Sequence, residues 1–161
     1  MKGKFYVRLF AFALTITIIG IFGFAVAQHK PADNMEIVKE KIRTDKKLLI
    51  ATNMQLTESE AKGFWPVYEA YQVELGKLRD REIKLIEQFS ASYETMSDDA
   101  AKNLLDDSLS IDSGHLKLRQ SYLAKFRGVL SDKKVARYYQ LESKIDAVLE
   151  YELARRIPLV R

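Results

Sequence analysis

The sequence has no cysteine and contains only two histidines, three prolines and seven glycines among 161 residues. The absence of cysteine excludes disulfides, thiol nucleophiles and thiolate metal sites. So few glycines and prolines argue against a turn-rich β-fold and favour helices. With 47% hydrophobic and 30% charged residues, the chain has the composition of one compact domain and not that of a disordered protein.

Motifs that mark common active sites are also missing. The chain has no glycine-rich phosphate loop, no Gly-x-Ser-x-Gly nucleophile turn and no His-Glu-x-x-His pair. Two aspartate pairs, Asp98-Asp99 and Asp106-Asp107, lack the spacing of a calcium loop, and adjacent residues on a helix do not face each other. We therefore predict that the protein is not an enzyme and has no cofactor.

The two histidines were considered as metal ligands. Neither His29 nor His115 has a second histidine three or four residues away, whereas a metal site needs several converging ligands. We predict no metal site and interpret His115 as a partly buried residue between helices. Metal sensing through His115 and nearby carboxylates stays open as a weaker alternative.

The N-terminus has the three parts of a secretory signal peptide. Lys2, Lys4 and Arg8 precede an apolar run from Leu9 to Phe24, and Ala25-Val26-Ala27 has the small-x-small pattern of a cleavage site. We predict that residues 1–27 are removed and that the protein is periplasmic. The alternative is an uncleaved inner-membrane anchor, since about 16 apolar residues approach the length that spans a bilayer.

Removal of this segment changes the charge of the protein. The whole chain has 26 basic and 22 acidic residues, a net charge of +4. The segment contains three of the basic residues and none of the acidic ones, so the mature chain is close to +1. Binding to nucleic acid then has no support from charge.

The next part of the chain predicts a linker and a first helix. Residues 28–34 contain Pro31 and form the linker, after which Asp33 or Asn34 caps a helix that ends near Ala51. Acidic residues separate the members of a basic cluster in this helix, which favours a solvated face over an anion-binding surface. The cluster comprises Lys39, Lys41, Arg43, Lys46 and Lys47.

The second helix is the longest in the prediction. Thr57 and Glu60 have the spacing of a capping box at its start, and the helix extends to about Tyr93. Its apolar residues alternate in steps of four and three, with Glu82 as the interruption, which is typical of a coiled-coil-like stripe. The stripe comprises Phe64, Tyr68, Tyr71, Leu75, Leu78, Leu85 and Phe89. Pro66, beyond the first turn, predicts a bend.

Two further helices follow. Ser97 caps a third helix that extends to about Val129, and Ser131 caps a fourth that extends to about Arg155 before Pro158. Short connections imply antiparallel neighbours. The prediction is an all-α protein, a long antiparallel helical hairpin with a shorter N-terminal and a C-terminal helix, in a single domain of residues 35–157 with a tail of residues 158–161.

Two helix starts resemble the Leu-Thr-x-x-Gln motifs of the Spy/CpxP family of periplasmic stress proteins, which includes heavy-metal-sensor-like relatives. The first is Leu56-Thr57-x-x-Glu60 and the second is Leu130-Ser131-x-x-Lys134, with Glu60 and Lys134 in place of the glutamines. The resemblance covers about residues 39–153. It implies a curved, often dimeric helical cradle that shields unfolded envelope proteins or moderates a stress-sensing kinase without ATP.

Two functional hypotheses follow. The first is an ATP-independent, chaperone-like or envelope-stress adaptor protein that binds apolar segments of clients on aromatic side chains of a helical cradle. Its expected client-binding residues are Phe64, Tyr68, Tyr71, Tyr122 and Phe126. The alternative is a structural or regulatory module, either an exported homodimer or a membrane-anchored sensor component, that binds one envelope partner. It predicts that Phe64, Tyr68 and Tyr71 are buried.

Overall fold

The computed structural model describes the backbone of residues 31–160 and the side chains of residues 41 and 43–160. In this part of the chain there are four α-helices, one short 3₁₀ helix and no strand, which confirms the all-α prediction. The predicted signal peptide lies outside the described residues. The elements are α1 (Pro31–Met54), α2 (Glu58–Ser92), η2 (Tyr93–Thr95), α3 (Asp98–Arg127) and α4 (Asp132–Ala154).

Three helices begin at the caps that the sequence predicts. At α2 the Thr57 hydroxyl accepts from the Glu60 amide at 3.3 Å, and the Thr57 amide donates to the Glu60 carboxylate at 2.8 Å. Ser97 and Ser131 each accept an amide hydrogen bond at the start of α3 and α4. Each cap satisfies an amide that has no partner inside its helix. The expected ends of these helices agree with the structure to within two residues.

The first helix is longer than predicted at both ends. It begins at Pro31 and not after Asp33 or Asn34, because the first turn of a helix does not need the amide that proline lacks. It continues to Met54 and stops where Gln55 takes a positive φ of 48°. The chain divides into two compact units after Ile37, and the following description concerns the second unit, from Val38 onward.

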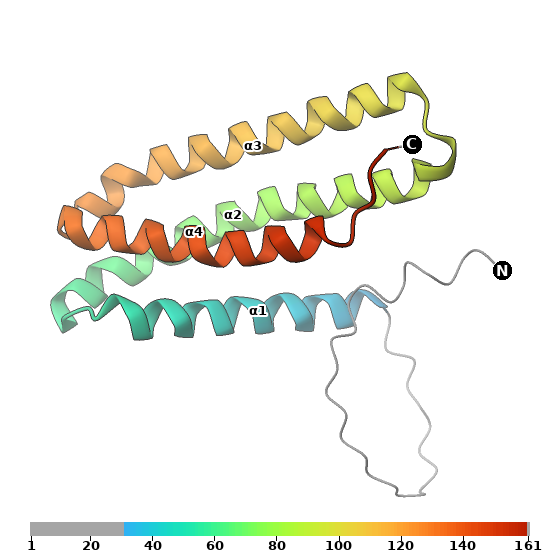
Figure 1. The fold of residues 1–161 in the computed structure, drawn as a ribbon. Coiled ribbons are helices and arrows are strands. Elements are labelled where there is room, and N and C mark those ends of the chain that lie inside the picture. The colour runs from blue at the N-terminus through green and yellow to red at the C-terminus, as the bar shows by residue number, and fades with distance from the viewer. Residues whose placement is uncertain (1–30, 161) are drawn as a thin grey trace, which may run out of the picture. The chain divides into compact units, whose positions relative to one another are not determined.

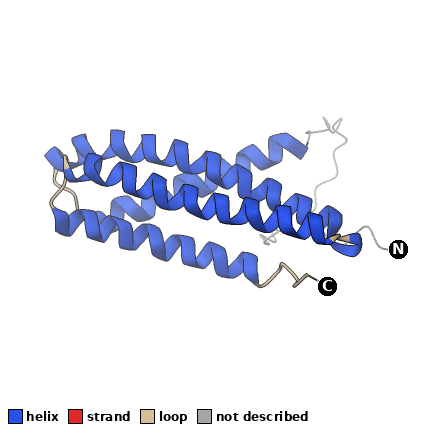
Figure 2. Ribbon diagram, turned by 90° about the horizontal axis from the view of Figure 1, so that it is seen from above, coloured by secondary structure: helices blue, strands red, loops and turns tan. Residues whose placement is uncertain are grey.

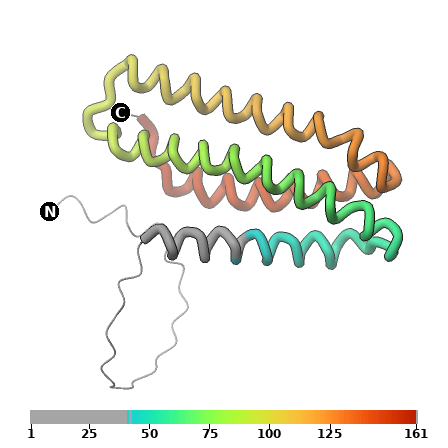
Figure 3. Tube along the Cα trace, turned by 180° about the vertical axis from the view of Figure 1, so that it is seen from behind, coloured from blue at the N-terminus to red at the C-terminus, as the bar shows by residue number. Residues whose placement is uncertain are grey.

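Successive helices in this unit run antiparallel and form an elongated helical bundle (Figure 1). The long hairpin of α2 and α3 is followed by α4, which turns back along the other helices. Seen from above, the described chain is helical apart from its connections and the C-terminal end (Figure 2). The colours of Figure 3 show the same order of helices from behind. Pro66 lies inside α2 without ending it, and the bend expected there stays a prediction.

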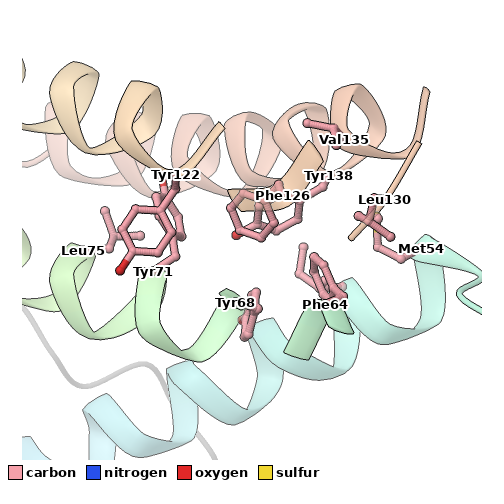
Figure 4. Close-up of a cluster of buried hydrophobic side chains, with 11 residues drawn as sticks. Met54, Phe64, Tyr68, Tyr71, Leu75, Tyr122, Phe126, Leu130, Val135 and Tyr138 are labelled. Carbon is pink, nitrogen blue, oxygen red and sulfur yellow. The ribbon is translucent and has the colours of Figure 1, made fainter. Parts of the chain in front are cut away.

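The core lies at the end of the bundle where the α1–α2 and α3–α4 connections meet. All four helices contribute side chains to it, and most of the larger ones are aromatic (Figure 4). The closest ring pair joins α3 to α4, with the centroids of Phe126 and Tyr138 4.6 Å apart. The buried cluster comprises Ile50, Met54, Phe64, Tyr68, Tyr71, Leu75, Tyr122, Phe126, Leu130, Val135 and Tyr138. We call it the aromatic core.

The hairpin continues beyond this core with less burial. On α2 the predicted stripe goes on through Leu78, Leu85 and Phe89, but these side chains are only partly buried. On α3, Gly114 faces Leu78 closely enough that a Cβ atom would lie 2.8 Å from the Leu78 Cδ2 atom. The two helices therefore approach each other closely at Gly114. We call residues 78–92 of α2 and 98–114 of α3 the distal half of the hairpin.

Candidate functional site

The five residues expected to bind clients are not at the surface. Their side chains are between 0% and 7% exposed and all belong to the aromatic core. Sequence spacing correctly placed Phe64, Tyr68 and Tyr71 on one face of α2, but α1, α3 and α4 cover that face. The expectation of an exposed client-binding face is corrected accordingly for Phe64, Tyr68, Tyr71, Tyr122 and Phe126.

The two helix-start motifs come together at one end of the bundle. Leu130 is buried in the aromatic core and Leu56 packs against it. Next to them, the Lys134 ammonium of α4 forms an ion pair with the Glu60 carboxylate of α2. This hydrogen bond from Lys134, followed by that from Thr57, holds the pKa of Glu60 below its ordinary value. Residues 60 and 134, which end the two helix-start motifs, thus carry opposite charges that bind each other.

The start of α4 also holds the end of α1. Lys134 donates to the Gln55 carbonyl at 3.1 Å, and the Arg137 guanidinium donates to the Asn53 carbonyl at 2.7 Å. Carbonyl groups at the end of a helix lack intrahelical partners, and cationic donors satisfy them. The α1–α2 connection is therefore bound to α4 through two side chains of α4.

Farther along α1, a buried ion pair joins this helix to α4. The Lys46 ammonium lies 2.6 Å from the Glu142 carboxylate, and their side chains are 4% and 0% exposed. Gln72 of α2 donates a hydrogen bond to the other Glu142 oxygen at 3.2 Å. Glu142 thus has a partner for each oxygen. Burying the two charges costs desolvation free energy. Removing one partner destabilises the protein further, because the other charge then stays buried alone.

Buried tyrosines surround this pair. The hydroxyl groups of Tyr68 and Tyr138 are buried without a hydrogen-bond partner of normal geometry among the described residues. Burial, followed by the nearby Glu142 carboxylate, raises the pKa of both tyrosines, and burial lowers the pKa of Lys46 against the opposing effect of Glu142. The pair is closed to solvent and joins α1 to α4, so it acts as an anchor between these two helices.

Sequence analysis missed this anchor. It assigned Lys46 to a solvated basic face, whereas the structure buries this lysine. Two other members of the basic cluster, Arg43 and Lys47, form ion pairs with Glu69 of α2 at 2.7 Å and 2.5 Å. Lys41 is exposed and paired with Asp45. The side chain of Lys39 lies outside the described residues. Much of the basic face of α1 is thus a docking face toward α2 and α4.

His115 lies between helices, as the sequence analysis expected. It is partly buried between α2 and α3, and its Nε2 atom lies 2.7 Å from a carboxylate oxygen of Glu82. Glu82 is the residue that interrupts the stripe of α2, so the interruption has a partner on α3. Among the described residues no group of three or more potential ligands converges on a metal position.

Apolar side chains remain exposed on the outer helix faces. On α3 these are Leu105, Leu109 and Leu116, each more than half exposed. On α4, Val148 is 65% and Tyr151 is 63% exposed. Sequence analysis did not single out the three leucines, which lie off the face of α3 that packs on α2.

No protein-family model, curated protein or solved structure matches the chain. The resemblance to the Spy/CpxP family therefore stays a prediction. None of the described helices combines the length and apolar character that crossing a membrane requires.

Proposed function

We propose that this protein is a non-enzymatic, partner-specific helical module of the cell envelope. The observation that supports this choice is the burial of Phe64, Tyr68 and Tyr71, which the partner-specific hypothesis requires and the open client cradle does not. A surface that accepts many unfolded clients needs accessible apolar area. The aromatic side chains that would supply it are instead engaged with one another.

The exposed apolar residues of α4 are the surface that we assign to the partner. Val148 and Tyr151 project from the part of α4 beyond Tyr138 and are not part of the aromatic core. An apolar pair of this kind, surrounded by polar residues, suits an anchor in a protein interface. The predicted export signal places this contact in the periplasm.

A cross-linking experiment in cells tests the proposal. A photoreactive residue at Val148 is expected to form one dominant adduct with an envelope protein, and the adduct should disappear when Tyr151→Ser is added. A photoreactive residue at Lys133, an exposed polar position of α4, is the matched control and should form no such adduct. A broad smear of many adducts at Val148 would contradict a specific partner.

A second candidate function is general protection of unfolded clients after α1 has moved away. It is favoured by the way α1 is held: within the described side chains it adds only Ile50 and Met54 to the aromatic core, whereas many of its other contacts are ionic. Undocking of α1 would uncover the side of the core that contains Tyr68. This function needs movement, while the partner-specific function does not.

Aggregation assays separate the two candidates. The partner-specific module is expected not to delay aggregation of chemically denatured, unrelated clients at equimolar dose. If the protein does delay it, Lys46→Met with Glu142→Leu should abolish the effect, because an apolar pair holds α1 in place more firmly than a buried ion pair. Trp65 fluorescence emission reports whether α1 is docked, because the Lys47 Nζ atom of α1 lies 5.2 Å from the centroid of the Trp65 ring. Protection by the parent protein alone would favour the second candidate over the partner-specific module, and protection by both proteins would contradict both candidates.

A further inference from the structure

The outer face of α3 carries an apolar line that the fold leaves uncovered. Leu105, Leu109 and Leu116 are 59%, 57% and 58% exposed. At 100° per residue, their side chains leave the helix within about 40° of one another, and they extend over about three turns. Single exposed leucines are common on protein surfaces, but several in line form a patch that marks an interaction site.

Carboxylates flank this apolar line. Residues 98–113 of α3 contain five aspartates and a single basic residue, Lys102. All five aspartates are exposed, and within the described part of the chain none of them forms an ion pair. Asp106 and Asp112 leave the helix about 60° to either side of Leu109. The surface is therefore an apolar line with an excess of negative charge along both edges.

Three of these aspartates have no role in holding the helix together. The other two lie in the first turn of α3, where the helix dipole favours negative charge. Asp106, Asp107 and Asp112 lie in the helix interior, where aspartate is one of the poorer helix formers. Arg81 of α2 reaches this part of α3, but it donates to the Ser110 hydroxyl at 3.3 Å and not to a carboxylate. Residues that break a local preference without a gain inside the chain are typical of functional surfaces.

A helix fits this surface better than an extended segment does. Extended segments gain much of their affinity from backbone hydrogen bonds to the edge of a sheet, and the face of a helix offers none. Leucines separated by four and then seven residues instead form the kind of ridge that packs against a facing helix. A facing helix that matches the charges carries lysines or arginines on both sides of its apolar stripe.

We propose that the outer face of α3, over residues 98–116, binds a basic amphipathic helix of another protein. The apolar stripe of that helix packs on the three leucines, and its cationic flanks pair with Asp106 and Asp112. This contact is additional to the one proposed for α4 and does not depend on it. Burial of the leucines supplies affinity, while the carboxylates select basic partners over acidic ones.

Titration of the purified protein against labelled peptides tests the proposal. The probe is a helical peptide of about 18 residues with leucines along one face and lysines on both flanks. One control peptide has the same composition in scrambled order, and the other has glutamates in place of the lysines. The probe should bind at least about tenfold more tightly than either control, because the first lacks the stripe and the second meets like charge. Equal affinity for the probe and the scrambled peptide would overturn the proposal.

Leucine substitutions locate the binding face. Leu109→Ser with Leu116→Ser should weaken binding of the probe at least about tenfold, because two apolar side chains leave the interface. Val148→Ser, at a similarly exposed apolar position of α4, is the matched control and should leave the affinity unchanged. Helicity measured by circular dichroism should be the same in all variants, because these positions are exposed. Equal weakening by Val148→Ser would place the peptide elsewhere and overturn the proposal.

Charge substitutions test the selection of a basic partner. Asp106→Asn with Asp112→Asn should weaken the probe by about three- to fivefold and make its affinity less sensitive to salt. Glu150→Gln removes an exposed carboxylate of α4 that forms no ion pair among the described residues, and it should change neither quantity. An unchanged affinity in the α3 variant would show that the aspartates do not contact the partner.

Two other occupants of this face are tested with the same leucine variant. An anionic membrane is disfavoured because it repels the carboxylates, and a second copy is disfavoured because Arg119 and Arg127 of α3 are engaged by Asp146 and Asp132 of their own chain. Phosphatidylglycerol vesicles that bind the parent but not the variant would assign the face to a membrane. A dimer in sedimentation that is lost in the variant would assign it to a second copy. Either result would overturn the proposal.

Discussion

The two ends of the α2–α3 hairpin have the same apolar periodicity but very different burial. Near the start of α2 the stripe residues Phe64, Tyr68, Tyr71 and Leu75 are at most 3% exposed. The stripe residues of α2 in the distal half, Leu78, Leu85 and Phe89, are only partly buried. At the first end, side chains of α1 and α4 join those of the hairpin. The difference shows that periodicity selects the inward face of a helix, while neighbouring helices decide how completely it is covered.

The largest expected effect is the difference in lost stability between truncating a buried residue of the aromatic core and truncating a partly buried residue of the distal half. Phe126→Ala removes a side chain that is 0% exposed and contacts rings of α2 and α4, and it should lower the free energy of unfolding by about 3–5 kcal/mol. Leu85→Ala in the distal half should cost roughly 1–2 kcal/mol, since its side chain is only partly buried. Urea unfolding measures both, and equal losses would remove the distinction between the two ends.

The second prediction concerns the buried ion pair at the covered end, which is the end of the hairpin that contains the aromatic core. Lys46→Ala leaves the Glu142 carboxylate buried with Gln72 as its remaining partner, and should destabilise the protein by about 3–5 kcal/mol. Lys46→Met with Glu142→Leu should be at least as stable as the parent, because no buried charge remains. Urea unfolding of both variants gives the comparison. A Lys46→Ala protein as stable as the parent would show that α1 is not held by this pair.

The helix starts and the inward face of α2 could be predicted from the sequence. The caps at Thr57, Ser97 and Ser131 are local, because each depends on residues within one turn, and the stripe of α2 needs only the spacing of its residues. The burial of Lys46 depends on Glu142, which is 96 residues away. No local pattern distinguishes a lysine with such a partner from one in solvent.

The same limit explains the misplaced client-binding site. Spacing established that Phe64, Tyr68 and Tyr71 share a face, and it left open whether the face is exposed or packed. The packing comes from Phe126 of α3 and Tyr138 of α4, whose positions depend on how the later helices fold back. The exposed leucines of α3 were missed because they can be recognised as an exposed group only when the packed face of α3 is known.

A third prediction uses the buried tyrosines, which are confined to the covered end. The raised pKa values of Tyr68, Tyr71 and Tyr138 mean that these groups stay protonated in the folded protein while the unfolded chain loses their protons above about pH 10. Their contribution to stability is complete below pH 10 and is lost as the pH rises further. Lys46 has the opposite effect, because its lowered pKa makes stability rise as the pH increases toward 10.5. It is a single group, whereas three tyrosines contribute to the loss at higher pH.

Tyr68→Phe tests this alkaline loss. The Tyr68 hydroxyl is buried and has no hydrogen-bond partner among the described residues, so its removal should change stability at pH 7 by less than about 1 kcal/mol. It should also make the loss of stability above about pH 10 shallower, because only two of the three buried tyrosines remain. Tyr151→Phe alters an exposed tyrosine and should change neither value. Unfolding in urea at a series of pH values provides the measurement. An unchanged alkaline profile in Tyr68→Phe would show that this hydroxyl is reached by water.

The smallest expected effects come from two glycines of the hairpin. Gly76→Ala should stabilise the protein by about 0.5–1 kcal/mol, since alanine favours the helix and nothing lies within 4 Å of the added Cβ atom. At Gly114 the same gain is opposed by a Cβ position 2.8 Å from the Leu78 Cδ2 atom. Leu78 is only partly buried, so its side chain has room to rotate away, and Gly114→Ala should be close to neutral. A loss above about 2 kcal/mol in thermal or urea unfolding would mean that the distal half is packed as rigidly as the aromatic core, and that partial burial there does not reflect loose packing.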